Sequence, residues 1–422
     1  MGDWENLPVE LLAHLYCYLS RRDRLSCSLV CENWKNGLDH VILWKTVIVH
    51  VDSDLMEPST VMLLRDYCKY IKNLEFGWAI PHRNNKWAQV KYKELTKRAV
   101  RFFLILYDNY IQIHSLRIFN WFDFMSFQKV TYHLSRFLKN QVSLKKIVFD
   151  NINMHSANYM KVFTSCLGSR GSITHLDIRS CYYCQSSFDC IYFRSCIEQL
   201  TYLKTFKLDY FILSCRLIDS ILTSKNRCLE NLEIVLKETS WHDHVIDDEQ
   251  WCLLCSACPN LKVTLIIRNV YHYGELRLYL KQSIPIVSLS IILPRIMDRG
   301  GRCKFRKTLN LLVTNYHRTL ETIDLHIKND GEIVDDVLLR LIRRCSKFKS
   351  VLFNGYLENP QMLKSSFSDI TFFCMTPNTL PDKHLVFSKV IRDDITELRH
   401  KRVQFTLIKR SPKSICSLLV LN

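Results

Sequence analysis

The sequence predicts an α/β protein in which a short helical module at the N-terminus precedes a long array of strand–helix units. Two observations lead to this expectation. Residues 7–44 carry large apolar side chains at helical spacing. Beyond them, a short apolar pattern recurs along most of the chain, as it does in solenoid proteins, where stacked units share one core.

The N-terminal segment predicts amphipathic helices. Pro8 can begin a helix, because a helix start leaves its first N–H groups unpaired anyway. Ser20 and Asp23 have the spacing of a capping box, which predicts a second helix carrying Leu25, Leu29, Val30 and Trp34. About 40 residues cannot bury so many large apolar side chains, so some must cover a neighbour or a partner. The apolar stripe of the first helix consists of Leu11, Leu12, Leu15 and Leu19.

The order and spacing of these residues resemble the F-box domain. The match comprises Leu7-Pro8, Glu10-Leu11-Leu12, Leu15, Leu19, Asp23, Leu25, Val30-Cys31, Trp34 and Leu43-Trp44. The resemblance implies a three-helix F-box within residues 1–50 that binds a Skp-type adaptor and, through it, a cullin–RING ubiquitin ligase core. An ordinary amphipathic helical hairpin is the alternative. The residues expected to form the adaptor-binding face and its small core are Leu7, Pro8, Leu11, Leu12, Leu15, Leu19, Val30, Cys31 and Trp34.

The rest of the chain repeats three apolar residues in the spacing Φ-x-x-Φ-x-Φ. Each copy predicts a short strand with one buried face, and amphipathic stretches such as 127–138, 217–222 and 337–345 predict the helices that follow. Successive middle residues are 29, 30 and 26 positions apart (147 to 176, to 206, to 232). The copies are Ile71-Leu74-Phe76, Ile113-Leu116-Ile118, Leu144-Ile147-Phe149, Ile173-Leu176-Ile178, Leu203-Phe206-Leu208, Leu229-Leu232-Ile234, Ile286-Leu289-Ile291, Leu320-Ile323-Leu325 and Phe348-Val351-Phe353, with a slipped copy at 259–263.

This strand–helix repeat resembles the leucine-rich repeat, whose period is about 20–29 residues. The resemblance implies a solenoid over residues 51–375, with a curved parallel sheet and helices on its convex face, and residues 376–422 as a capping segment. Cys181 occupies the turn position where that family normally has Asn or Cys, so the other units must turn by different contacts. An ordinary α/β domain is the alternative. Residues 77–97, 237–250, 294–307 and 376–383 are expected to be loops.

Composition restricts the cellular setting. No stretch reaches the 18 or more apolar residues of a membrane span, and the acidic N-terminus has no secretion-signal pattern. We therefore expect a cytoplasmic or nuclear protein with no membrane partner. The 18 cysteines are then expected to be reduced and mostly buried.

The sequence contains no catalytic signature that we recognise, so a non-catalytic protein is expected. It lacks a phosphate-binding loop, a nucleophile elbow and a zinc-protease helix. Two cysteine groups have metal-ligand spacing, one at Cys181 and Cys184 with Cys190 and Cys196 beyond, the other at Cys252, Cys255 and Cys258. Core packing explains both groups better than zinc, and neither a metal nor a cofactor is expected.

Together these patterns predict a substrate-recognition subunit of a Skp–cullin–F-box ubiquitin ligase, with an unidentified protein substrate on the concave face of the repeats. The alternative is a protein that binds nucleic acid or another anionic partner, because the net charge is +17 and basic runs occur at 86–98, 299–307, 340–349 and 399–402. These basic residues are spread over the chain, which makes nucleic acid the less favoured partner. The residues expected on the concave face are Arg117, Val148, Asp177, Arg179, Lys207, Asp209, Glu233, Asp324, His326 and Asn354.

Overall fold

A computed structural model shows two compact units. The first comprises Met1–Ile234 and Leu253–Leu261, and the second comprises Val235–Cys252 and Lys262–Asn422. The predicted capping segment, 376–422, lies outside the described residues. The structure describes residues 4–79, 86–121, 128–181, 188, 190–224, 228–237, 245–270, 272–293, 305–327, 329, 332–355, 357–359 and 371–374.

The first unit begins with the three helices that the resemblance implied. They are α1 (Val9–Cys17), α2 (Arg21–Ser28) and α3 (Glu32–Gly37). Pro8 directly precedes α1, and the Ser20 hydroxyl accepts a hydrogen bond from the Asp23 N–H at 3.2 Å, as the capping box predicted. The predicted second helix is wrong in its extent: α2 ends at Ser28, and Trp34 lies on α3 after a break in which Cys31 adopts an extended conformation.

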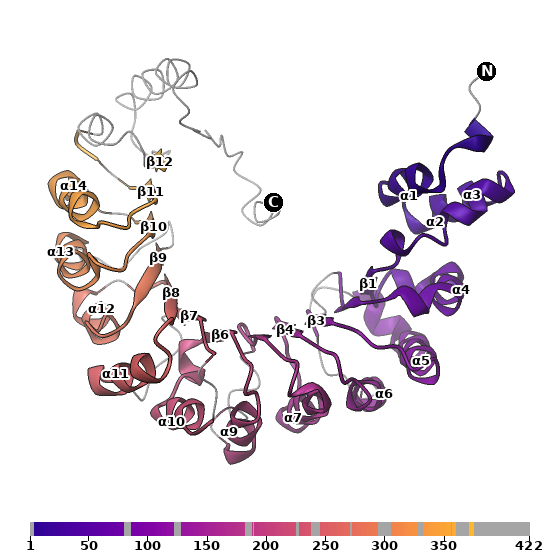
Figure 1. Ribbon diagram of the computed structural model, residues 1–422, viewed down its shortest axis with the longest axis horizontal. Helices are drawn as coiled ribbons and strands as arrows, with labels where there is room; N and C mark the ends of the chain where they lie inside the picture. The colour runs from indigo at the N-terminus through magenta and orange to yellow at the C-terminus, as the bar shows by residue number, and fades with distance from the viewer. Residues whose placement is uncertain are drawn as a thin grey trace. The chain divides into compact units, whose positions relative to one another are not determined.

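A parallel sheet with helices along one side follows in the same unit. Figure 1 shows the strands of this unit on one side and its helices on the other. Each strand pairs in register with the strand before it in the chain. The strands are β1 (Thr46–His50), β2 (Asn73–Gly77), β3 (Ser115–Phe119), β4 (Lys146–Asp150), β5 (His175–Asp177) and β6 (Thr205–Asp209), and the helices are α4 (Pro58–Tyr67), α5 (Lys86–Asp108), α6 (Gln128–Lys139), α7 (Ser156–Ser165), α9 (Ile191–Glu198) and α10 (Cys215–Thr223).

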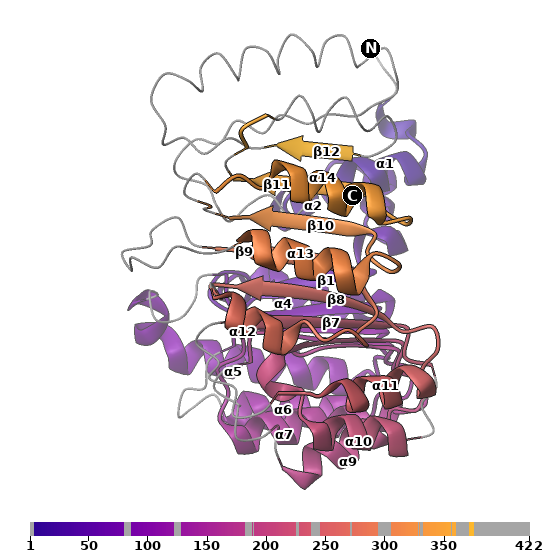
Figure 2. The ribbon, with the colours of Figure 1, turned by 90° about the vertical axis from the view of Figure 1, so that its left-hand side faces the viewer.

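The second unit has the same construction. Its strands are parallel neighbours in chain order, with one register shift between Val263 and Thr264, and Figure 2 shows β8, β10 and β12 pointing the same way. The division between the two units falls within β7 (Asn231–Lys237) and within α11 (Asp248–Ala257), so that each of these elements has residues in both units. The other elements are β8 (Lys262–Arg268), β9 (Ile286–Ile292), β10 (Thr322–His326), β11 (Ser350–Asn354), β12 (Thr371–Cys374), α12 (Tyr273–Tyr279), α13 (Phe305–Tyr316) and α14 (Asp335–Arg344).

The apolar repeat predicted this fold class correctly. The middle and third apolar residues of the predicted copies are buried and lie on strands, as Leu116 and Ile118 of β3 illustrate, except that Ile178 directly follows β5. The slipped copy at 259–263 leads into β8. Within each unit the strand order follows the chain order, which is the arrangement of a repeat solenoid rather than of a doubly wound α/β domain.

The expected loop at 77–97 is wrong in its second half. Residues 86–97 form the beginning of α5, a helix of 23 residues. The charged residues at its start led to the loop prediction. The helix nevertheless has an apolar face, since Leu95, Ala99, Phe102 and Leu106 recur at helical spacing and are fully buried. Smaller errors of the same kind occur where α11 begins at Asp248 and α13 at Phe305, inside expected loops.

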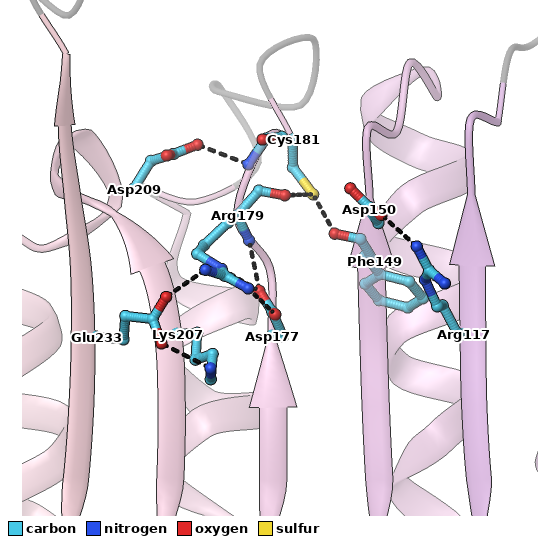
Figure 3. Close-up of polar contacts among 10 residues, drawn as sticks. Arg117, Phe149, Asp150, Asp177, Arg179, Cys181, Lys207, Asp209 and Glu233 are labelled. Carbon is cyan, nitrogen blue, oxygen red and sulfur yellow. Dashed lines mark hydrogen bonds and ion pairs between the residues drawn. The ribbon is translucent and has the colours of Figure 1, made fainter. Parts of the chain in front are cut away.

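The chain turns after each strand through contacts that differ from one repeat to the next, as the sequence suggested. The Cys181 thiol, fully buried, donates to the Phe149 carbonyl oxygen at 3.6 Å (Figure 3). Trp121 and Ile152, also buried, occupy the equivalent positions of the two preceding units. One residue after β3 and β4, Asn120 and Asn151 adopt left-handed conformations, with φ of 48° and 53°, which asparagine tolerates better than most residues.

Replacement of one strand residue should distinguish the two faces of the sheet. Ile147 points into the core and Val148, its neighbour on β4, points to the open face. We expect Ile147→Ala to lower the free energy of unfolding by about 2–5 kcal/mol, because it leaves a cavity. We expect Val148→Ala to lower it by about 1 kcal/mol or less. Urea denaturation measures both, and equal losses would contradict the assigned register.

Candidate docking surfaces

Helix α1 divides its apolar residues between a core face and an open face. Leu12 and Tyr16 are buried together with Leu38. Leu11 and Leu15, on another side of the same helix, keep 51% and 49% of their surface exposed. Of the residues expected to bind the adaptor, Leu12 therefore belongs to the internal core, whereas Leu11 and Leu15 are available to a partner.

Two other residues of the expected adaptor set, Leu7 and Trp34, take part in hydrogen bonds that hold the N-terminal segment in place. The Trp34 indole N–H donates to the Trp4 carbonyl oxygen at 2.8 Å, and the Tyr16 hydroxyl donates to the Trp34 carbonyl oxygen at 2.8 Å. The amide of Asn33 donates to the carbonyl oxygen of Leu7 at 2.7 Å. Leu7 and Trp34 are half-buried, so they stabilise the module as well as bordering its surface.

The remaining members of that set lie around the same three helices. Pro8 and Val30 are exposed, and Leu19 and Cys31 are half-buried. Sequence reasoning missed Tyr18 and assigned no surface role to Leu29, although these two side chains are 90% and 87% exposed. Their exposure could not be read from spacing, because both lie where a helix ends.

The helical module shares its core with the first strand–helix unit. Trp44 stacks on Tyr67 of α4, with ring centroids 4.4 Å apart and planes 3° from parallel. Leu43 and Leu63 belong to the same buried cluster. On the polar side, Arg21 of α2 donates to the Ile48 carbonyl oxygen of β1 and lies 3.2 Å from the Asp54 carboxylate. The two parts therefore contact each other through packed side chains and direct hydrogen bonds.

The open strand face of the first unit carries charges of alternating sign. The registers place Glu75, Arg117, Val148, Asp177 and Lys207 in one row across β2 to β6. Arg117 bridges Glu75 at 2.9 Å and Asp150, outside the row on β4, at 2.8 Å. The sequence identified Arg117 as a surface residue but missed its two carboxylate partners.

A second network surrounds Arg179, just beyond β5 (Figure 3). Its guanidinium donates two hydrogen bonds to Asp177, at 2.9 and 2.6 Å, and another to Glu233 of β7. Lys207 lies 2.6 Å from the other Glu233 oxygen. Burial alone would lower the pKa of Arg179, but the hydrogen bonds and charges of the carboxylates raise it above its ordinary value. These predicted substrate residues are thus already paired with one another.

Asp209 does not lie on the open face as predicted. Its side chain is fully buried at the end of β6 and accepts a hydrogen bond from the Ser180 N–H at 2.7 Å. Asp52 does the same at the end of β1, where it accepts from the Ala79 N–H at 2.9 Å. Asp209 therefore stabilises the turn after the preceding strand, β5, and Asp52 stabilises the turn after the following strand, β2, because each carboxylate supplies an acceptor to a backbone N–H that pairs with no strand.

The predicted face residues of the second unit form a separate chain of contacts. The Ser290 hydroxyl donates to Asp324 at 3.1 Å, His326 lies 2.9 Å from the other Asp324 oxygen, and Asn354 lies 3.2 Å from the His326 ring. A serine nucleophile is activated by a hydrogen bond to a base. Here the carboxylate separates Ser290 from His326, so these contacts do not make a catalytic triad.

The two cysteine groups do not converge on one point in the described part of the chain. Cys181 and Cys196 are buried whereas Cys190 is half-buried, and Cys252, Cys255 and Cys258 range from exposed to buried along α11 and the residue after it. Among the described residues, no group of three or more His, Cys, Asp and Glu side chains is placed to hold a metal ion. Cys184 lies outside the described residues.

Comparison with protein families places the N-terminal module. Residues 4–46 match the model of the F-box domain. This segment contains α1, α2 and α3 and ends at the first residue of β1. None of the described helices is long and apolar enough to cross a membrane.

Removal of the central guanidinium should reveal how much the paired charges stabilise the strand face. Arg179→Met leaves Asp177 and Glu233, which are 15% and 17% exposed, without their shared partner. We expect a loss of about 1–2 kcal/mol in the free energy of unfolding. Lys204→Met, which breaks the more exposed pair with Glu230, should cost at most about 0.5 kcal/mol. If thermal or urea denaturation gave the same result for both, the ion pairs would be equivalent and the network unimportant.

Proposed function

We propose that this chain, which carries an F-box domain at residues 4–46, is the substrate-recognition subunit of a Skp–cullin–F-box ubiquitin ligase complex. F-box domains bind Skp-type adaptors, and the adaptor connects them to a cullin–RING core. The proposal rests on the F-box domain itself, which is joined to a parallel-sheet repeat with a separate open face. The chain would contribute binding and positioning, not chemistry.

The exposed apolar residues of the F-box support adaptor binding. A small domain normally buries leucine side chains, and apolar residues gathered on an open helix face mark interaction sites. Leu11 and Leu15 are one helical turn apart on α1 and half exposed. We propose that they, with the exposed Pro8 and Val30, contact the adaptor, while Leu12 maintains the fold beneath them.

The shared core between the F-box and the first repeat supports a positioning role. Ubiquitin transfer requires that a substrate lysine stay near the charged conjugating enzyme, and a rigid connection raises its effective concentration there. A flexible linker would lower this effective concentration. Here Trp44 and Tyr67 stack across the junction, and Arg21 reaches both Ile48 and Asp54.

The open strand face is our proposed substrate surface. In the first unit four carboxylates (Glu75, Asp150, Asp177 and Glu233) pair with three cations (Arg117, Arg179 and Lys207). Such a face is nearly neutral, so shape and hydrogen bonding would select its ligand more than net charge. We also propose a cytoplasmic or nuclear location, which suits the buried thiols of Cys68, Cys166 and Cys345.

A paired substitution on α1 tests adaptor binding. We expect Leu11→Asp/Leu15→Asp to weaken binding of the full chain to a Skp-type adaptor by about 30-fold or more, because interface anchors contribute roughly 2 kcal/mol each. Surface plasmon resonance with the immobilised adaptor measures the change. Ile191→Asp/Tyr192→Asp, at exposed apolar residues of α9, is the matched control and should bind normally.

Leu12→Asp separates docking from folding. Because Leu12 is fully buried, this change should unfold the F-box and lower the melting temperature, whereas Leu11→Asp/Leu15→Asp should not. Undiminished adaptor binding by the Leu11→Asp/Leu15→Asp protein would overturn the assignment of this face, and no binding by the unaltered chain would overturn the proposed function.

A further inference from the structure

In the first compact unit, successive strand–helix repeats are joined at one edge of the sheet by a ladder of backbone hydrogen bonds, in which each carbonyl group accepts two N–H groups. The residue just before each strand accepts two backbone N–H groups from the next unit. The Lys45 carbonyl oxygen accepts from Lys72 at 3.0 Å and from Asn73 at 2.8 Å. The carbonyl groups of Lys72, His114, Lys145, Thr174 and Lys204 each accept two N–H groups in the same way. These residues are therefore stacked in register along the edge where the strands begin.

This edge ladder carries an excess of positive charge. Four consecutive positions before β1 to β4 are Lys45, Lys72, His114 and Lys145. None of the three lysines forms an ion pair within the described part of the chain, in contrast to Lys204 further along, which lies 2.9 Å from Glu230. Neighbouring strands are about 4.8 Å apart, so the lysine backbones are held close together although like charges repel.

The titration of His114 reflects this crowding. Desolvation of the ring comes first, and the nearby Lys72, Lys145 and Lys45 add to it, so that the pKa of His114 is lowered below its ordinary value. The next histidine along the edge, His175, has a lowered pKa for the same reasons, with Lys146 and Lys207 as its main charged neighbours. Besides desolvation, the lysines near each ring thus disfavour its protonated form.

Exposed apolar side chains border the same edge. Tyr110 and Val142 lie on the segments that lead into β3 and β4, and they are 78% and 68% exposed. These segments are neighbours, because the Val142 N–H donates to the Gln112 side chain at 3.1 Å. A partner that neutralised the lysines would also find apolar surface beside them.

We infer that the edge formed by Lys45, Lys72, His114 and Lys145, with Tyr110 and Val142 beside it, binds an acidic, extended segment of a partner protein. The inference rests on the proposed function in taking that partner to be a protein substrate. Three strand spacings span about 14 Å, which an extended peptide covers with four or five residues at about 3.3 Å each. Acidic side chains on such a segment meet the lysines, and its apolar side chains meet Tyr110 and Val142.

The described residues favour an acidic peptide over nucleic acid. Arginine forks are the usual means of holding phosphates, yet Arg117 and Arg179 of this unit are occupied by carboxylates. On the adjoining open face Glu75, Asp150 and Asp177 pair with arginines, so that face is nearly neutral and adds no positive surface along which a longer polyphosphate chain could continue.

Charge reversal in the full-length chain tests the inference. The probe is a fluorescein-labelled decapeptide of glutamates interrupted by leucines, with a glutamine-for-glutamate version as the neutral comparison. Fluorescence anisotropy should show binding of the acidic probe only, and Lys72→Glu/Lys145→Glu should weaken it by about tenfold or more. Lys93→Glu/Lys129→Glu makes the same change in net charge on α5 and α6, near the other ends of these helices, and should leave binding within about twofold.

Equal weakening by both pairs, or no binding of the acidic probe, would overturn the inference. Tighter binding of a twelve-residue oligothymidine at the same edge, lost in Lys72→Glu/Lys145→Glu, would also overturn it and assign the edge to nucleic acid. Adaptor binding is measured on the same proteins. If Lys72→Glu/Lys145→Glu binds the adaptor normally but not the peptide, both proposals stand. If the unaltered chain binds the peptide but not the adaptor, the proposed function alone fails.

Discussion

Burial of the strand residues governs the architecture of this protein. The strands present apolar side chains, such as Leu116 and Ile118 of β3, which a single strand and helix cannot enclose. They become buried only because the next strand pairs in register and its helix covers the same side. Parallel pairing in chain order satisfies this requirement unit after unit, and it leaves the opposite side of the strands open.

The F-box also completes its core by packing against a neighbouring element, helix α4. Three helices of 9, 8 and 6 residues cannot bury Tyr16, Leu43 and Trp44 by themselves, so these residues pack against Leu63 and Tyr67 of α4. The consequence is mechanical. A domain that completes its core with the first repeat cannot swing freely from it, which agrees with the positioning role that we propose.

The charges of the first unit are used in two different ways. On the strand face, cations and carboxylates from neighbouring strands neutralise one another, and Arg179 joins Asp177 to Glu233. At the edge, Lys72 and Lys145 have no such partner in the described residues, and none of the positions beside them in the ladder (Lys45, His114 and Thr174) is acidic. The net charge of the chain therefore gives little guidance about the strand face, while the edge carries a local excess.

The sequence alone determined the helical module, the apolar residues of the strands and the order of the units, because these depend on spacing along the chain. Spacing could not predict that Leu11 is exposed and Leu12 buried, since their exposure depends on how α1 packs on its neighbours. It also misjudged residues 86–97, where a basic surface hid a helical stripe.

Only the tertiary structure decided which polar residues are available. Asp209 and Asp177 look alike in the sequence, but Asp209 is buried under a turn while Asp177 pairs with Arg179 at the surface. The pairing of Arg117 with Glu75 and Asp150, and the alignment of Lys45, Lys72, His114 and Lys145, join residues 27 to 42 positions apart. Such contacts depend on strand register, which the apolar repeat indicates and which backbone hydrogen bonds between neighbouring strands establish, and on side-chain orientations that only the tertiary structure shows.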